Sequence, residues 1–329
     1  MSGTILVVTA SYDQAVETVL PILDEMGEKY FRLNTDRAPI ESWTTNVIRS
    51  GSLGGEISNG ERTIDAKEIK SCWHRRSDKT KTADSMHPGY AKFVKGETHF
   101  ALWSFYTTLP NAIWVNHPLI GARLLEGNKL YQMRAALDSG ILVPDTIVSS
   151  SPEELIAFSE EHGGRVAVKV MRANILAREG SEELMFVYTN TLSTEDLIAR
   201  KDAIRISSIM AQEYIPKEFE LRVTVVGNEI FACSIDSQNS EVAKEDWRRY
   251  DFDNVAHERF ELPEDVKHKL LNMMRGMGLV YGAIDLIVTP NGKYIFLEVN
   301  PSGQWGWIEG LTGMKISESI ARILADPTT

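Results

Sequence analysis

The sequence predicts a mixed α/β (α+β) fold, and three stretches carry this prediction. Residues 4–10 (TILVVTA) are continuously apolar, as in a buried parallel strand, and apolar residues at helical spacing follow from Val16 to Leu23. Residues 165–171 (RVAVKVM) have the same strand character after a helical stretch. Residues 281–299 hold two apolar-rich strands around a Pro-Asn-Gly turn and are expected to form a hairpin.

Composition places the chain among globular proteins and limits its partners. Its 329 residues are 43% hydrophobic and 25% charged, which suits two or three domains with buried cores. The chain has 35 basic and 46 acidic residues, and the resulting net charge of −11 argues against nucleic-acid binding through a broad basic surface.

Cysteine usage and hydropathy bear on the compartment. Cys72 and Cys233 lie in apolar contexts without CxxC or His spacing, so we expect buried thiols in reducing surroundings and no zinc. The N-terminus has no basic region followed by an apolar core, and no apolar run reaches 18 residues. We therefore expect a cytoplasmic protein that does not bind membranes.

The order of elements divides the chain into three parts. We expect an N-terminal α/β domain over residues 1–112, a central part over residues 113–206 and a C-terminal part over residues 207–329. A helix is expected over residues 91–109, and its packed face is expected to carry the aromatic residues Phe93, Phe100, Trp103 and Tyr106.

Two further helices have clear start signals. One begins at Asn128-Lys129 and stops at Gly140. Another begins at Ser151-Pro152, with proline in the first turn and acidic residues after it. The apolar face expected on the earlier of these helices consists of Leu130, Met133, Ala136 and Leu137.

The hairpin carries the most informative acidic residues. Asp285 interrupts its first strand, and Glu298, followed by Asn300, interrupts the second. Paired strands would bring the two carboxylates within about 5 Å of each other. Hard oxygen ligands of this kind suit Mg²⁺. The alternative is an acidic edge hairpin whose carboxylates lie in water.

Several charged residues upstream sit in apolar strands. Lys169 lies among Val and Met, which suggests an anionic partner, although a lysine on the wet face of a strand is the alternative. Glu220 and Arg222 point to the same side of one strand and could meet a ribose and a phosphate, or form only a surface ion pair. The stretch 212–215 (QEYI) ends another strand and could contact an adenine.

The segment Trp73-His74-Arg75-Arg76 has two interpretations. It is either a strand end with solvated arginines or an anion-binding edge that holds an acidic substrate. The residues alone leave both open.

Taken in order, these residues resemble the ATP-grasp series of carboxylate–amine ligases over residues 113–325. The series is Lys129, Lys169, Gln212-Glu213-Tyr214-Ile215, Glu220-x-Arg222, Asp246-Trp247-Arg248, Asp285 and Glu298-x-Asn300. The finer resemblance, carried by VNHP, NKLYQMRAALDSGILVPDTIVSSSPEEL, SIDSQ…DWRRYD, NPSGQWGWIE and the WHRR segment, is to the ATP-grasp maturases of microviridin-type peptides (graspetides). These are relatives of ribosomal-protein glutamate ligase and glutathione synthetase.

The resemblance implies an ATP-grasp fold behind an N-terminal pre-ATP-grasp domain, with ATP and Mg²⁺, two ions, as cofactors. Asp285, Glu298 and Asn300 would hold the metal. Lys129 and Lys169 would contact phosphates, and Arg222 and Arg248 would contact the γ-phosphate and the acyl phosphate. The residues that would contact the nucleoside are Gln212, Glu213, Tyr214, Ile215 and Glu220.

One departure concerns the stretch 171–184, which has one glycine where many ATP-grasp enzymes have a glycine-rich loop. Arg172 or Arg178 could act there instead.

The resemblance also implies a function and partners. The first hypothesis is a macrocyclase that joins Asp or Glu side chains of a precursor peptide to Thr or Ser hydroxyls or Lys amines. The second is a ligase that adds an amino acid to a small molecule or a protein tail, and the third a nucleotide-binding adaptor without turnover. The peptide's leader would dock near residues 219–261, its acidic core would meet Arg75, Arg76, Arg248 and Arg249, and a homodimer is left open.

Overall fold

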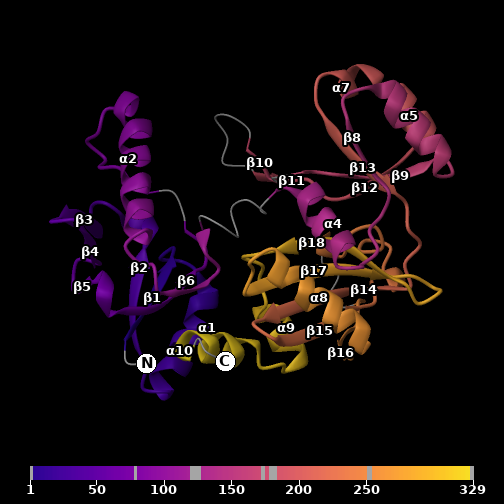
Figure 1. Cartoon of the computed structure of the whole chain (residues 1–329). Coiled ribbons are helices and arrows are strands. Elements are labelled where there is room, and N and C mark those ends of the chain that lie inside the picture. The colour runs from indigo at the N-terminus through magenta and orange to yellow at the C-terminus, as the bar shows by residue number, and fades with distance from the viewer. Residues whose placement is uncertain are drawn as a thin grey trace.

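The computed structural model describes residues 3–77, 80–118, 127–171, 175–177, 184–249 and 254–326. Three larger sheets follow one another along the chain and helices cover their faces, so the predicted mixed fold is confirmed (Figure 1). Within the described residues no helix is both long and apolar enough to cross a bilayer. Cys72 and Cys233 are buried and free, as expected.

The first sheet is parallel, with strand order β2-β1-β6-β7. Its strands are β1 (Thr4–Thr9), β2 (Lys29–Asn34), β6 (Ile69–His74) and β7 (Ile113–Val115). Helix α1 (Gln14–Glu25) follows β1, and Asp13 caps it by accepting from the Ala15 N–H. The predicted apolar face of α1 is buried, because it packs on the sheet and on the last helix, α10 (Ile316–Ala325). A small antiparallel sheet of β3 (Trp43–Arg49), β4 (Ser52–Ser58) and β5 (Thr63–Asp65) lies beside it, with short 3-10 turns η1 (Thr35–Arg37) and η2 (Ala66–Glu68).

Helix α2 (Pro88–Tyr106) corrects one prediction. Phe93 is 67% exposed and Phe100 is 64% exposed, whereas Trp103 is partly buried and Tyr106 is buried, so only the second half of the expected aromatic face is packed. The helix packs on β3 and β4 and buries Leu102 and Phe105 together with the predicted Tyr106. Six residues separate Phe100 from Tyr106, which places them about 120° apart around the helix. An aromatic count alone cannot tell these two faces apart.

The central sheet has strand order β12-β9-β13-β8, with all pairs antiparallel. It consists of β8 (Thr146–Ser149), β9 (Arg165–Lys169), β12 (Asn190–Ser193) and β13 (Ile209–Glu213). Helices α5 (Pro152–Glu161), α6 (Thr194–Ala199) and α7 (Lys201–Arg205) cover one side, and β10 (Ile175–Ala177) pairs with β11 (Leu184–Phe186). Ser151 caps α5 and proline occupies its first turn, as predicted.

Helix α4 (Lys129–Asp138) confirms its predicted start and corrects its predicted face. Asn128 caps it by accepting from the Tyr131 N–H. Met133 and Ala136 are buried, but Leu130 and Leu137 are about half exposed, because Gln132 takes a buried position on the packed side.

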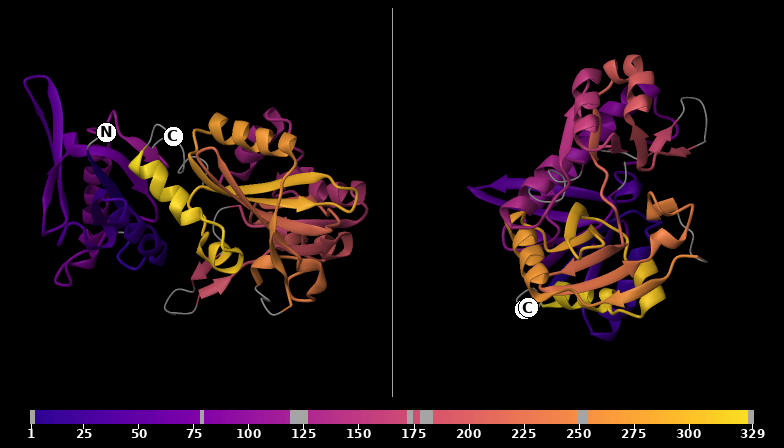
Figure 2. Two further views of the ribbon diagram at one scale, coloured as in Figure 1. Left: turned by 90° about the horizontal axis from the view of Figure 1, so that it is seen from below. Right: turned by 90° about the vertical axis from the view of Figure 1, so that its right-hand side faces the viewer.

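The C-terminal sheet is antiparallel, with strand order β16-β15-β14-β17-β18. Its strands are β14 (Phe219–Val226), β15 (Glu229–Ile235), β16 (His257–Phe260), β17 (Tyr281–Val288) and β18 (Tyr294–Asn300). Helix α8 (Glu264–Gly276) covers one face (Figure 2). The turns η4 (Ser237–Asn239) and η5 (Trp247–Arg249) and the helix α9 (Gly306–Thr312) complete this part. The predicted hairpin is β17–β18, in which Asp285 lies opposite Glu298, with an irregularity after Asp285.

Asn116 joins the first sheet to this hairpin. Its buried side chain donates to the carbonyls of Tyr281 (2.8 Å) and Pro301 (2.9 Å). Its Oδ1 accepts from the N–H groups of Val280 (2.8 Å) and Tyr281 (3.0 Å). One amide therefore satisfies four backbone groups of β17 and its surroundings.

Asn116→Ala should destabilise the protein by about 2–4 kcal/mol, because buried backbone donors and acceptors lose their partner. Thermal unfolding followed by circular dichroism should show a midpoint several degrees lower. Asn46→Ala is the matched control, since the exposed Asn46 side chain makes one hydrogen bond within the described part of the chain, to the Ala101 carbonyl. Equal midpoints for the two variants would contradict the role of Asn116.

Candidate active site

A cavity of about 520 Å³ lies between the central and the C-terminal sheet. Its walls come from β9 and the end of β13 on one side and from β14, β17, β18 and the start of α4 on the other. All twelve predicted site residues line it: Lys129, Lys169, Gln212, Glu213, Tyr214, Ile215, Glu220, Arg222, Arg248, Asp285, Glu298 and Asn300. Arg172 and Arg178 fall outside the described residues.

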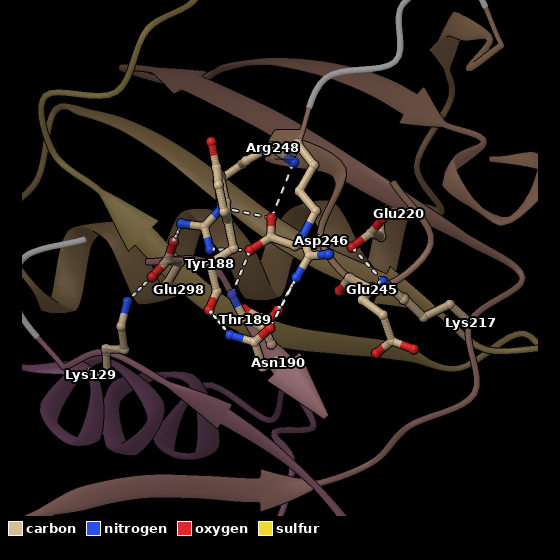
Figure 3. A network of polar contacts seen from close by, with 11 residues as sticks. Lys129, Tyr188, Thr189, Asn190, Lys217, Glu220, Glu245, Asp246, Arg248 and Glu298 are labelled. Carbon is tan, nitrogen blue, oxygen red and sulfur yellow. Dashed lines mark hydrogen bonds and ion pairs between the residues drawn. The ribbon is translucent and has the colours of Figure 1, made fainter. Parts of the chain in front are cut away.

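The first turn of α4 places Lys129 in the cavity. One turn further along, the Gln132 side chain fixes α4 to the edge strand β18. It donates to the Val299 carbonyl and accepts from the Val299 N–H, both at 3.0 Å. Lys129 forms an ion pair with Glu298 (Figure 3). Burial, with the positive charge of Arg248 adding to it, lowers the pKa of Lys129 to about 8.

Arg222 and Asp285 face each other across β14 and β17. The Arg222 Nη1 donates to Asp285 Oδ1 at 2.8 Å, and both side chains are buried. Arg222 also lies 5.7 Å from the Trp247 ring and donates to the Gln304 carbonyl at 3.5 Å. Its buried Nε has no hydrogen-bond partner among the described residues, which leaves one donor available to a ligand.

The alternative of a surface Glu220–Arg222 ion pair is wrong. Glu220 is buried and accepts instead from Lys217 Nζ at 3.0 Å and from the Ser237 hydroxyl. Burial raises the pKa of Glu220, although Lys217 and Ser237 act against the shift. The carboxylate is therefore held by two neighbours at the cavity wall.

Asp246 fixes Arg248 and ties it to the central part of the chain (Figure 3). Its carboxylate accepts from Arg248 Nε (2.9 Å), Arg248 Nη2 (2.7 Å) and the Thr189 N–H (2.9 Å). Burial alone would raise the pKa of Asp246, but these bonds outweigh it and lower the pKa to about 2. Trp247 packs 5.2 Å from Trp307, so the segment is anchored beside the cavity as expected.

Lys169 lies at the end of β9 and lines the cavity. Burial, with the charges of Lys129 and Arg248 adding to it, lowers its pKa to about 7. Among the described residues Lys169 has no carboxylate within 4.0 Å. A partly buried, unpaired lysine does not fit the wet-face alternative and calls for an anionic ligand.

The end of β13 forms another wall. Gln212 donates to the Thr146 hydroxyl at 3.0 Å and is buried. Glu213 pairs with the backbone of Asp145, and Arg165 lies 3.8 Å from the Tyr214 ring. With Ile215 these residues leave a mixed polar and apolar edge open to the cavity.

The acidic pair does not lie in water, although Glu298 belongs to the edge strand β18. β17 is an interior strand, Asp285 is 7% exposed, and Arg222 neutralises it. Glu298 is partly buried and lies between Lys129 and Arg248, whose Nη1 is 3.7 Å away. Asn300 is exposed, and its Oδ1 accepts from the Ser302 N–H at 2.9 Å. Opposed carboxylates beside an amide oxygen form a donor set that fits a hard divalent ion.

The two arginines after β6 behave differently. Arg75 is 2% exposed, donates to the Ser302 carbonyl and to Gln304 Oε1 (2.9 Å), and lies 4.8 Å from the Trp305 ring. Burial lowers the pKa of Arg75 to about 10. Both predictions for Arg75 are therefore wrong, since its side chain is neither solvated nor free to bind an acidic substrate. Arg76 is exposed and lines the cavity.

Other site residues were not predicted. Gln132 and Gln304 carry no charge, and Lys217 precedes a strand whose partners the sequence does not show. A glutamine among the apolar residues of α4 was the available signal for Gln132.

Comparisons with known proteins agree with this arrangement. The MvdD pre-ATP grasp domain matches residues 4–119, and the RimK-like ATP-grasp domain matches residues 126–324. Macrocyclase MdnC from Microcystis aeruginosa MRC, solved with precursor peptide MdnA, is 32% identical, with a TM-score of 0.85 over 98% of this chain and 99% of that chain.

Two further solved structures are similar over nearly the whole chain. A RiPP-associated ATP-grasp ligase of Chryseobacterium gregarium, in complex with ADP and a leader and core peptide, is 29% identical, with a TM-score of 0.89 over 99% of this chain and 97% of that chain. Macrocyclase MdnB from Microcystis aeruginosa MRC is 29% identical, with a TM-score of 0.79 over 98% and 99%.

A comparison with curated protein sequences gave no significant match. The two domain matches together span nearly all of the described chain, and the RimK-like match alone covers more than half of it. The chain therefore belongs to the ATP-grasp ligases, with an MvdD-type pre-ATP-grasp domain ahead of a RimK-like ATP-grasp domain.

Proposed function

We propose that this ligase activates Asp or Glu side chains of a ribosomally made precursor peptide with ATP and joins them to Ser or Thr hydroxyls or Lys amines, which closes ester or amide macrocycles. The observation that carries the proposal is the cavity itself, where cations surround a pair of carboxylates opposed across two strands. Relatives at about 30% identity were solved with a precursor peptide, and with ADP and a leader and core peptide.

The nucleotide would lie between the two sheets. Gln212, Glu213, Tyr214 and Ile215 would face the adenine from β13, and Glu220 would accept from a ribose hydroxyl. Lys129 and Lys169 would contact the phosphates. Arg222 and Arg248 would face the γ-phosphate, because Asp285 and Asp246 hold their guanidinium groups at the cavity wall.

Asp285, Glu298 and Asn300 would hold Mg²⁺, and we propose two ions, whose remaining ligand positions phosphate oxygens and water would fill. When bound, the metal neutralises phosphate charge during transfer. The surrounding lysines and arginines must then release the carboxylates, and each released cation becomes available to a phosphate.

The chemistry needs an activated acyl group. A substrate carboxylate oxygen attacks the γ-phosphorus, ADP leaves, and the resulting acyl phosphate is attacked by a hydroxyl or amine, which loses its proton as phosphate departs. Arg222 and Arg248 stabilise the charge that develops, a role worth about 3 kcal/mol per group. A nucleophilic Ser, Cys or His of the enzyme is not required.

The peptide needs access and a docking surface. β14 is the central strand of its sheet and nearly all of it is buried, so within the hairpin of residues 219–236 only the partly buried β15 offers surface. The described part of the connection 237–261 is more exposed and remains our proposed leader site. A cytoplasmic location and the formation of a homodimer remain predictions.

With ATP and Mg²⁺, the purified protein should convert a cognate Asp/Glu- and Thr- or Lys-bearing peptide into products lighter by about 18 Da per ring, since each acyl phosphate yields one condensation. Mass spectrometry measures this directly. Deleting the leader should slow the reaction strongly, because docking positions the core. Products heavier by one amino-acid residue would instead identify a ligase that adds a free amino acid.

Glu298→Gln should abolish ADP release in the presence of Mg²⁺, because it removes a metal ligand charge at almost constant volume. The same change frees Lys129 and leaves Arg248 paired with Asp246 alone, so a non-hydrolysable ATP analogue should bind more tightly than to wild type when EDTA removes the metal. Calorimetry measures both conditions. Glu258→Gln, an exposed position on β16, is the control. Near-normal ADP release by Glu298→Gln would refute the assignment.

Binding of the ATP analogue should weaken as pH rises above 7.5. Lys169, with its pKa of about 7, loses its charge in this range, and only the charged form attracts phosphate. Affinity should fall by up to about tenfold per pH unit. Lys169→Arg, which stays charged, should remove the part of this slope that lies below about pH 8, above which Lys129 also loses its charge. Lys169→Met should bind weakly at every pH. An unchanged slope in Lys169→Arg would rule Lys169 out as the titrating group.

A further inference from the structure

The cations that line the cavity divide into two groups. Four of them are paired with carboxylates of the chain: Lys129 with Glu298, Lys217 with Glu220, Arg222 with Asp285, and Arg248 with Asp246 and Glu298. Among the described residues, Lys169 and Arg76 have no carboxylate within 4.0 Å. Lys169 and Arg76 are therefore the lining cations that are available to bind an anionic ligand.

Arg76 enters the cavity at a different place from Lys169. Of the described residues, it is the one lining residue that comes from the chain before Gly127. Its neighbour Arg75 is bonded to Ser302 and Gln304, in the loop directly after Asn300. Lys169 belongs instead to the central sheet that carries the proposed adenine wall, so Arg76 lies at the hairpin end of the cavity.

The contacts of Arg75 fix the backbone from which the Arg76 side chain extends. The Arg75 N–H donates to the Val8 carbonyl at 2.9 Å, which fixes the backbone to β1. The Arg75 guanidinium is held by the loop and lies over the Trp305 ring. Arg76 thus presents an exposed guanidinium from a rigid position, an arrangement that suits recognition more than chain stability.

We propose that Arg76 binds the carboxylate of the peptide's acidic side chain and so selects Asp or Glu for activation. This inference rests on the proposed function. An acidic side chain that approaches Asp285 and Glu298 is repelled by them, and the arginines beside it are already paired. A guanidinium fork matches a carboxylate in a bidentate way and leaves a carboxylate lone pair free to react. The shared chemistry, an oxyanion, also fits a phosphate, and the test separates the two sources.

Arg76→Gln should raise the KM for the acidic peptide about tenfold or more, with kcat changed less, because a charge-assisted contact is lost. Its Kd for the ATP analogue and its thermal midpoint should equal those of wild type. Arg76→Lys should recover part of the peptide affinity. Arg49→Gln, an exposed arginine at the end of β3, is the matched control and should behave as wild type.

A second peptide makes the test specific. Wild type should bind the acidic peptide more tightly than a peptide with Asn or Gln in place of the acceptor acids, and Arg76→Gln should lose this preference. A preference that survives in Arg76→Gln overturns the inference, as does an ATP-analogue Kd that rises as much as the peptide KM, which would assign Arg76 to phosphate. Absence of any 18 Da loss with wild type would refute the proposed function itself, independently of Arg76.

Discussion

A row of charges across three neighbouring strands governs this structure. Arg222 on β14 lies opposite Asp285 on β17, and Asp285 lies opposite Glu298 on β18. Burying a charge in an apolar sheet costs free energy unless an opposite charge compensates it. The register of the three strands therefore determines whether the charges of the site are balanced. A slip of one residue would turn Asp285 to the face that packs under α8 and would leave Arg222 without its partner.

The surrounding elements serve this row. Gln132 fastens α4 to β18 and thereby brings Lys129 to Glu298. Asp246 holds Arg248 toward the same carboxylate from the opposite side. In the absence of ligands, four of the cations that line the cavity are paired with carboxylates of the chain, so a metal ion that binds these carboxylates must displace a cation that a phosphate can then bind. Binding of the metal and of the phosphates is coupled for this reason, with no need for a distant switch.

The sequence predicted what depends on local pattern. The pairing of Asp285 with Glu298 followed from a short turn between two strands, and the caps of α4 and α5 followed from Asn128 and Ser151. It could not predict which face of α2 is covered, because the strands that decide this lie far away in the chain. For the same reason Arg75 and Arg76 looked alike, although the loop after Asn300 buries one and leaves the other exposed. The residues that line the cavity could be predicted from the ATP-grasp series, whereas the partner of each cation is set by tertiary contacts.

The packing of α10 against α1 bears on how the chain acquires its structure. Figures 1 and 2 show this last described helix lying along the first, and its apolar residues complete the core beneath the N-terminal sheet. During synthesis, α1 leaves the ribosome long before the helix that covers it, and its apolar face must wait for nearly the whole chain. The N-terminal sheet therefore completes its core late, and the interval before α10 emerges is when the nascent protein is most exposed to chaperones and to aggregation.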